Sequence, residues 1–142
     1  MTETRCGESV HVYLVDTSVL TRLRHPQVAA RLRELEDVRY SPMSGLEYRF
    51  SASNEVQWDL LAEVLNGFAR EPFGAEVFER ADEVQRLLAA ASLKGRKPPD
   101  LLIAAQAEIA ALTVVHYDRD YDYISSVTGQ PTLWIVAPGT VD

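Results

Sequence analysis

Short apolar segments alternate with helical patterns along this chain, and this alternation constrains the fold more than any other feature. Each segment is short and rich in β-branched or aromatic side chains, which is typical of a strand buried on both faces. The segments span residues 11–15 (HVYLV), 38–40, 113–115 and 132–136. Strands separated by helices pair in parallel, so the sequence predicts a three-layer α/β domain with a central parallel sheet.

Helical patterns fill the intervals between these segments. Ser41-Pro42 places a capping hydroxyl before a proline, a combination typical of a helix start. Segment 101–112 is nearly all apolar, so we expect a helix that is buried inside the protein. The expected helices cover residues 19–23, 28–35, 42–53, 56–68, 75–93, 101–112 and 118–127.

The composition is that of one ordinary globular domain. The 142 residues are 46% hydrophobic and 25% charged, which excludes a disordered or collagen-like chain. We therefore expect a single domain over 1–142, in which 1–8 form a polar N-terminal extension that need not be ordered. Segment 101–112 is too short to span a bilayer. Cys6 is the only cysteine and 1–8 lack an apolar signal core, so we expect a cytoplasmic protein without an internal disulfide or a cysteine-based zinc site.

The net charge of −7 argues against a protein that coats nucleic acid through bulk positive charge. The charge is unevenly distributed: residues 51–93 contain eight acids and three arginines, and acids spaced by three or four indicate a solvated helical face. Basic residues gather in 20–50, where the arginines include Arg22, Arg24, Arg31, Arg33 and Arg39, and in a loop containing Lys94, Arg96 and Lys97. This loop adjoins Asp100 and is the better candidate for phosphate contacts.

Acidic residues occur where strands or loops end. Asp16 follows the first predicted strand, Asp118 follows the third, and Asp100 follows the basic loop. Because ligands of such folds bind beyond the C-terminal ends of the parallel strands, we expect these carboxylates to converge there.

Glu47 would bring a fourth carboxylate to the same place. It lies beside an apolar stripe formed by Met43, Leu46 and Phe50, so we expect its side chain to point inward. Converging buried carboxylates repel one another, and a divalent cation removes this cost. Oxygen ligands without cysteine or a histidine pair favour Mg²⁺ or Mn²⁺.

Each acid also has a local explanation. Asp16 and Asp100 could cap the helices that follow them, and Ser44 with Glu47 fits the S-x-x-E capping box. Acids at the start of the last helix interact favourably with its dipole: Asp118, Asp120 and Asp122. No single acid distinguishes a metal site from these roles; the set as a whole favours the site.

Four segments, in this order and spacing, resemble the acidic motifs of PIN domains. More narrowly, they resemble those of VapC ribonuclease toxins from prokaryotic toxin–antitoxin pairs. The segments are YLVDTSVL (13–20), SPMSGLEYRFSA (41–52), KPPDLLIAA (97–105) and HYDRDYDYI (116–124). The tail TGQPTLWIVAPGTV (128–141) is similar to that of one VapC subgroup, so the likeness spans 11–141.

The resemblance implies a compact α/β/α PIN-like fold whose acids hold one or two Mg²⁺ or Mn²⁺ ions. Matched to the motifs residue by residue, the catalytic and metal-binding acids would be Asp16, Glu47, Asp100 and Asp118. Asp120 would be an auxiliary metal ligand, or the substitute for Asp118 if that side chain turns outward.

Five residues near these acids are candidates for contact with the substrate: Ser18, Lys94, Arg96, Lys97 and His116. Ser18 could hold a carboxylate or water, with helix capping as the alternative. His116 and Tyr117 stand where the family often has a hydroxyl residue before the fourth acid. His116 could contact the substrate or make an ordinary hydrogen bond at the strand end.

The activity that the resemblance implies is metal-dependent hydrolysis of structured RNA, either transfer or ribosomal RNA, leaving 5′-phosphates. It also implies a VapB-type antitoxin that sends a basic side chain into the acidic pocket, and a homodimer. Apolar surface for both interfaces could come from Trp58, Leu61, Phe68 and Phe73, although core packing explains them equally well. A non-catalytic PIN-like binding module and a DNA-directed nuclease with the same pocket remain as alternatives.

Overall fold

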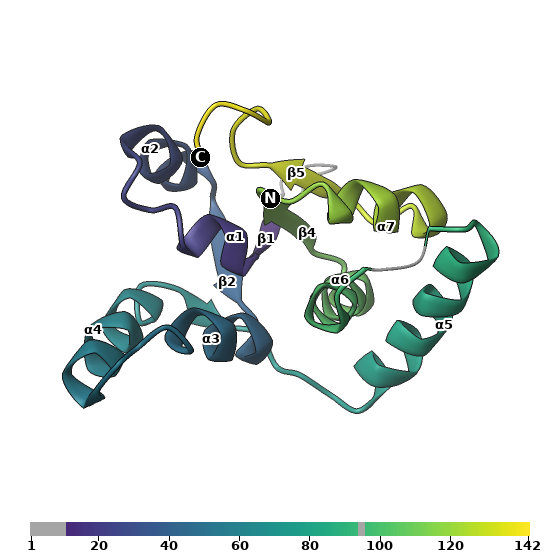
Figure 1. Cartoon of the computed structure of the whole chain (residues 1–142), viewed down its shortest axis with the longest axis horizontal. Helices are drawn as coiled ribbons and strands as arrows, with labels where there is room; N and C mark the ends of the chain where they lie inside the picture. The colour runs from purple at the N-terminus through teal and green to yellow at the C-terminus, as the bar shows by residue number, and fades with distance from the viewer. Residues whose placement is uncertain (1–10, 94–95) are drawn as a thin grey trace, which may run out of the picture.

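The chain folds into a parallel sheet of five strands with helices on both faces (Figure 1). This computed structural model describes residues 11–93 and 96–142, so the predicted extension 1–8 and Lys94 lie outside the described residues. The strands, in chain order, are β1 (Val12–Val15), β2 (Asp37–Tyr40), β3 (Ala69–Arg70), β4 (Thr113–His116) and β5 (Thr132–Trp134). Their spatial order is β3-β2-β1-β4-β5, and all neighbours are parallel.

Helices cover both faces of the sheet because successive strand residues point to opposite sides. On β1 and β4, Leu14 and Val114 pack against one group of helices, whereas Val15 and Val115 pack against the other. The first group is α5 (Glu76–Ala90), α6 (Pro98–Ala110) and α7 (Asp120–Thr128). The second includes α1 (Thr17–Leu20) and α2 (Pro26–Glu34). Helices α3 (Pro42–Arg49) and α4 (Glu55–Leu65) follow β2 in the chain, and Tyr48 of α3 and Leu65 of α4 belong to this second packing group. The predicted three-layer α/β fold is confirmed.

Helix α6 is buried along most of its length, as its apolar sequence predicts. It begins at Pro98, three residues earlier than expected, because prolines are tolerated in a first turn whose N–H groups have no helical partner. It ends before Ala111, which adopts a left-handed conformation with φ of 59°. The early start places Asp100 inside the first turn. None of the helices described here is long and apolar enough to cross a membrane.

Helix boundaries around the α3–α4 connection differ from the prediction. Helix α3 ends at Arg49 instead of Ser53, and α4 begins after Asn54, whose side chain accepts a hydrogen bond from Gln57 N at 2.9 Å. Strand β3 was not predicted, because a two-residue strand has no periodic pattern.

The capping box predicted for Ser44 and Glu47 is wrong. Ser41 is the N-cap of α3, and its hydroxyl accepts a hydrogen bond from Met43 N at 3.1 Å. Ser44 lies inside the helix, where its hydroxyl donates to the backbone oxygen of Val15 at 3.3 Å. The hydroxyl therefore joins α3 to the end of β1.

The inward-facing stripe predicted on α3 is also wrong. Leu46 is 63% exposed and Phe50 is 89% exposed. Glu47 is nevertheless half-buried and faces α1, because helices α1 and α3 pack together at this edge. The acids predicted on the solvated faces of α4 and α5 are all exposed: Glu55, Asp59, Glu63, Glu76, Glu79 and Glu83.

Candidate active site

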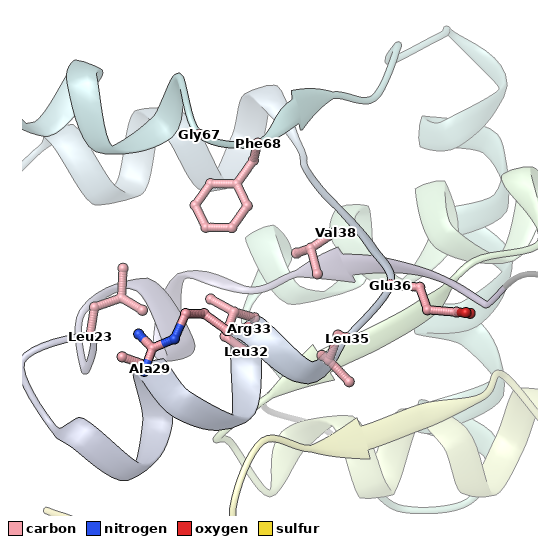
Figure 2. A pocket seen from close by; sticks show the side chains of 9 residues that line it. All are labelled: Leu23, Ala29, Leu32, Arg33, Leu35, Glu36, Val38, Gly67 and Phe68. Atoms are coloured by element: carbon pink, nitrogen blue, oxygen red, sulfur yellow. The ribbon is translucent and has the colours of Figure 1, made fainter.

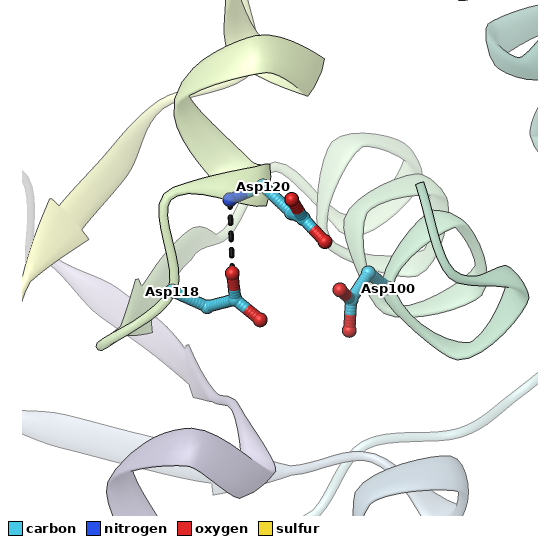
Figure 3. A group of neighbouring side chains, drawn as sticks. All are labelled: Asp100, Asp118 and Asp120. Atoms are coloured by element: carbon cyan, nitrogen blue, oxygen red, sulfur yellow. Dashed lines mark hydrogen bonds between the residues drawn. The ribbon is translucent and has the colours of Figure 1, made fainter. Parts of the chain in front are cut away.

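The C-terminal edge of the sheet brings three aspartates together. Asp118 and Asp120 follow β4, and Asp100 comes from the first turn of α6. Figure 3 shows the three carboxylates facing a common space. One oxygen from each lies within 4.8 Å of the others, so the group could hold a metal ion.

Asp100 is the most deeply buried of these three acids. It is 3% exposed, and within the described chain its Oδ2 accepts no hydrogen bond. Burial raises the pKa of Asp100 to about 7; the charge of Asp16 adds to the increase, and the charge of Lys97 opposes it. The capping role considered for Asp100 is wrong, because the N-cap position of α6 is Lys97. The Lys97 ammonium, 3.5 Å from Asp100 Oδ2, partly offsets the cost of burying this carboxylate.

Asp118 and Asp120 are held by local contacts. Asp118 Oδ1 accepts a hydrogen bond from Asp120 N at 2.9 Å, drawn as the dashed line in Figure 3. Asp120 Oδ1 pairs with Arg96 Nη1 at 3.0 Å. Burial by itself would raise the pKa of Asp118, but hydrogen bonds from Asp120 N and Lys97 outweigh it and lower the pKa. The Asp118 side chain therefore favours the ionised form that a cation requires.

Lys97 places its ammonium among all three carboxylates. Its Nζ lies 3.1 Å from Asp118, 3.5 Å from Asp100 and 3.6 Å from Asp120. Burial lowers the pKa of Lys97, but the hydrogen bond to Asp118 and the charges of the three acids more than compensate and raise it. A side-chain cation thus already neutralises part of this cluster.

Asp16 lies beside the cluster and is held by three donors. Its Oδ2 accepts hydrogen bonds from Ser18 N at 3.0 Å and Ser18 Oγ at 2.6 Å, and its Oδ1 accepts one from Tyr121 Oη at 2.6 Å. The capping role is real, because Asp16 is the N-cap of α1. Its charge raises the pKa of both Asp100 and Glu47, so Asp16 interacts electrostatically with both carboxylates.

Glu47 adjoins Asp16 from α3. Its Oε1 accepts a hydrogen bond from Thr17 Oγ1 at 2.8 Å. Burial raises the pKa of Glu47 despite this hydrogen bond, and the charge of Asp16 raises it further. The four predicted catalytic acids therefore occupy one edge of the sheet, with Asp100, Asp118 and Asp120 closest together.

Two of the predicted substrate contacts have other partners. His116 is fully buried, its Nδ1 accepts a hydrogen bond from Asp118 N at 3.1 Å, and burial lowers its pKa. We therefore correct the prediction that His116 contacts the substrate, because its ring is enclosed by Tyr121 and Trp134. The Ser18 hydroxyl donates to Asp16 and accepts from Tyr117 N at 2.8 Å, so it holds a carboxylate as proposed.

The predicted arginine surface of residues 20–50 is partly occupied by acids of the same chain. Arg39 pairs with Asp37 and Glu71, and Arg24 pairs with Asp142. The basic loop is closer to the acids: Arg96 pairs with Asp120 and stacks over the Tyr123 ring at 4.5 Å. Lys94, the third basic residue of that loop, lies outside the described residues.

Sequence reasoning missed two residues that touch the acids. Thr17 is the hydroxyl residue directly after Asp16, so its position next to a strand-end acid was a usable signal. Tyr121 could not have been selected, because Tyr117 and Tyr123 lie nearby in the sequence and only the packing of α7 decides which ring reaches Asp16.

Known proteins resemble this chain over most of its length. The PIN domain family matches residues 13–126. Ribonuclease VapC51 of Mycobacterium tuberculosis is 47% identical over 133 residues, covering 92% of this chain and 97% of the relative. Ribonuclease VapC18 of the same organism is 43% identical over 136 residues, covering 92% and 99%.

Solved structures share the fold at lower sequence identity. VapBC2 from Rickettsia felis, bound to a promoter DNA fragment, has a TM-score of 0.73 at 16% identity and covers 87% of this chain and 98% of its own. FitAcB from Neisseria gonorrhoeae has a TM-score of 0.68 at 21% identity and covers 87% and 97%. These structures share the fold, and the family match together with the two ribonucleases shows that the chain belongs to the PIN-domain family, among the proteins named VapC.

Proposed function

We propose that the protein is a metal-dependent endoribonuclease toxin that hydrolyses phosphodiester bonds in transfer or ribosomal RNA. Its metal ligands are Asp16, Glu47, Asp100 and Asp118, with Asp120 as an auxiliary ligand. The observation that carries the proposal is the convergence of three carboxylates, from Asp100, Asp118 and Asp120, of which Asp100 is buried. The similarity to two ribonucleases supports RNA as the substrate.

The chemistry of the ligands favours Mg²⁺ or Mn²⁺. All the candidate ligand atoms are carboxylate oxygens, which suit hard divalent cations. His116 lies close to the acids, but its Nδ1 already accepts a hydrogen bond from Asp118 N. Among the described residues, the group whose ligand atoms lie together consists of aspartates alone, and it does not include the nitrogen and sulfur ligands that are typical of zinc.

The residues of the chain orient the acids and attract the phosphate. Three donors hold Asp16, and Thr17 holds Glu47, so these carboxylates are positioned before any ligand arrives. Lys97 and Arg96 supply positive charge at the same place, where an RNA phosphate would otherwise meet only acids. A bound divalent cation would supply Lewis-acid polarisation of the phosphoryl oxygen and activate the attacking water.

Cleavage of total cellular RNA tests this proposal directly. We expect the purified protein in Mg²⁺ to produce one dominant new 5′-phosphate end, detected by mapping 5′ ends, and we expect EDTA to abolish the product. Cleavage of DNA alone would favour the DNA-directed nuclease. The absence of cleavage together with the absence of Mn²⁺ binding would favour the non-catalytic module.

The antitoxin of this proposal would bind an apolar groove between α2, β2 and the end of α4. Solved structural neighbours include toxin–antitoxin complexes, which supports a VapB-type partner. The groove has a volume of about 340 Å³ and is shown in Figure 2. Its lining is mostly apolar but also includes the charged residues Arg33 and Glu36; the apolar side chains are Leu23, Ala29, Leu32, Leu35, Val38 and Phe68. We propose that an apolar segment of the antitoxin packs here.

Lysine in place of Ala29 should prevent formation of the antitoxin complex, because its long side chain would fill the groove and add a charge next to the apolar residues that line it. Ala30→Lys is the matched control, since Ala30 is the next residue of α2 and is exposed. Co-purification with the product of an adjacent small open reading frame measures the effect. Equal recovery of the complex with both variants would place the antitoxin elsewhere.

The homodimer and the cytoplasmic location are also part of this proposal. Exposed apolar residues on α3 and α4 offer surface to a second copy: Leu46, Phe50, Val56, Trp58, Leu60 and Val64. Of the residues expected at an interface, Trp58 is 45% exposed, whereas Phe73 packs against the core. Light scattering measures the mass in solution, and cell fractionation measures the location.

A further inference from the structure

A buried hydrogen bond ties Asp16 to helix α7. Tyr121 Oη donates to Asp16 Oδ1 at 2.6 Å, although the two residues are 105 positions apart in the sequence. Tyr121 is 0% exposed and Asp16 is 3% exposed, so water does not replace this contact. The bond therefore joins the end of β1 to α7, the helix that begins at Asp120 of the acidic cluster.

A second connection runs between the same two parts of the chain. Ser18 Oγ donates to Asp16 Oδ2 at 2.6 Å, and Tyr117 N donates to Ser18 Oγ at 2.8 Å. Both connections to Asp16 thus come from the segment 117–121. That segment also carries Asp118 and Asp120, so one stretch of chain supplies two acids of the cluster and holds a third.

The Tyr121 hydroxyl serves as a hydrogen-bond donor to Asp16 in this position. Packing does not require the hydroxyl, because the contact with His116 is made by the ring, with centroids 4.9 Å apart. A phenylalanine would fill the same space without burying a polar group.

We propose that Tyr121 is a positioning residue that fixes Asp16 relative to Asp118 and Asp120 and thereby sets the affinity of the site for divalent cations. This inference rests on the proposed function, in which Asp16 is a metal ligand. Hydrogen bonds to a ligating carboxylate hold its oxygens in the orientation that the metal requires, and loss of such a partner typically weakens binding about 10- to 100-fold. Without the hydroxyl, the donors that remain to the Asp16 carboxylate within the described residues are those of Ser18, which both bind Oδ2.

The experiment compares Mn²⁺ affinity in Tyr121→Phe and Tyr117→Phe, measured by electron paramagnetic resonance of free Mn²⁺. We expect Tyr121→Phe to bind Mn²⁺ about 10- to 100-fold more weakly while its melting curve shows a folded protein. Tyr117→Phe is the matched control, because it too removes a hydrogen-bonded hydroxyl, but one that contacts Gly139 and Val141. The control should retain the wild-type affinity.

A second measurement separates positioning from general stability. If Tyr121 acts through Asp16, Tyr121→Phe should have no further effect on Mn²⁺ affinity in an Asp16→Asn background. Unchanged affinity in the single variant, or an equal loss in both backgrounds, would overturn the inference. Asp100→Asn distinguishes a failure of the proposed function from a failure of the inference about Tyr121. Wild-type Mn²⁺ affinity in Asp100→Asn would overturn the proposed function, regardless of the result for Tyr121→Phe.

Discussion

Asparagine in place of Asp100 should abolish RNA cleavage and, in the absence of metal, raise the melting temperature at pH 8. Activity is lost because the amide is a poor ligand for a divalent cation and removes a negative charge from the cluster. Stability increases because Asp100 is buried with one oxygen that accepts no hydrogen bond within the described residues. The same residue is thus expected to be essential for function and costly for the fold.

The pH dependence of this effect follows from the pKa of Asp100, which burial raises from 3.8 to about 7 in the folded protein. Between these values the folded state binds more protons than the unfolded state, so the free energy of unfolding decreases as the pH rises. The full cost is present above pH 7 and amounts to at most about 4 kcal/mol, at roughly 1.36 kcal/mol per pH unit. Asparagine cannot ionise, so the variant should lack this slope.

Thermal melts at pH 5 and pH 8 in EDTA, together with a cleavage assay in Mg²⁺, measure both effects. Asp122→Asn is the matched control, because Asp122 lies in the first turn of α7, is exposed and accepts a hydrogen bond from Trp134 Nε1. This variant should cleave RNA normally and have the melting temperature of the wild type. Residual cleavage by Asp100→Asn, or a lower melting temperature at pH 8, would contradict the prediction.

Asp16→Ala should also abolish cleavage but should lower the melting temperature. The substitution removes the N-cap of α1 and leaves the buried Tyr121 hydroxyl without its acceptor. Losses of this kind cost on the order of 1–3 kcal/mol each. The melting temperature is thus expected to fall when Asp16 is replaced and to rise when Asp100 is replaced. The difference arises because both oxygens of Asp16 accept hydrogen bonds, whereas Asp100 Oδ2 accepts none within the described residues.

Methionine in place of Lys97 should change metal affinity and RNA affinity in opposite directions. Metal binding should become about tenfold tighter, because the Lys97 ammonium contacts the same three carboxylates that the metal would use. RNA binding should become weaker, and the slope of log affinity against log salt should fall by about 1, because one phosphate contact is lost. Methionine preserves most of the side-chain volume.

Calorimetry with Mn²⁺ and a salt series of RNA-binding measurements test both effects. Arg119→Met is the matched control: Arg119 lies between Asp118 and Asp120 in the sequence, is exposed, and forms no ion pair within the described chain. It should leave the Mn²⁺ affinity unchanged. Weaker Mn²⁺ binding by Lys97→Met would show that Lys97 does not compete with the metal. An unchanged salt slope would show that Lys97 does not contact the phosphate.

The positions of the acids at strand ends could be predicted because they depend on local patterns. Val12–Val15 is a β-branched, apolar run that ends at Asp16, and parallel pairing places such ends on one edge. Glu47 was expected to point inward for a reason that proved wrong, because Leu46 on the proposed stripe is exposed. Its side chain is half-buried because Thr17 and α1 lie against α3, which no helical periodicity encodes.

The sequence by itself determined the alternation of helices with four of the five strands, the burial of α6 and the four candidate acids. These features depend on residues that are neighbours along the chain, and their periodicity is visible without a structure. Only the tertiary structure decided that Lys97 lies among the acids, that His116 is enclosed and that Tyr121 holds Asp16. These contacts join residues that are far apart in the chain or depend on side-chain orientation, and they follow from sheet order and helix packing.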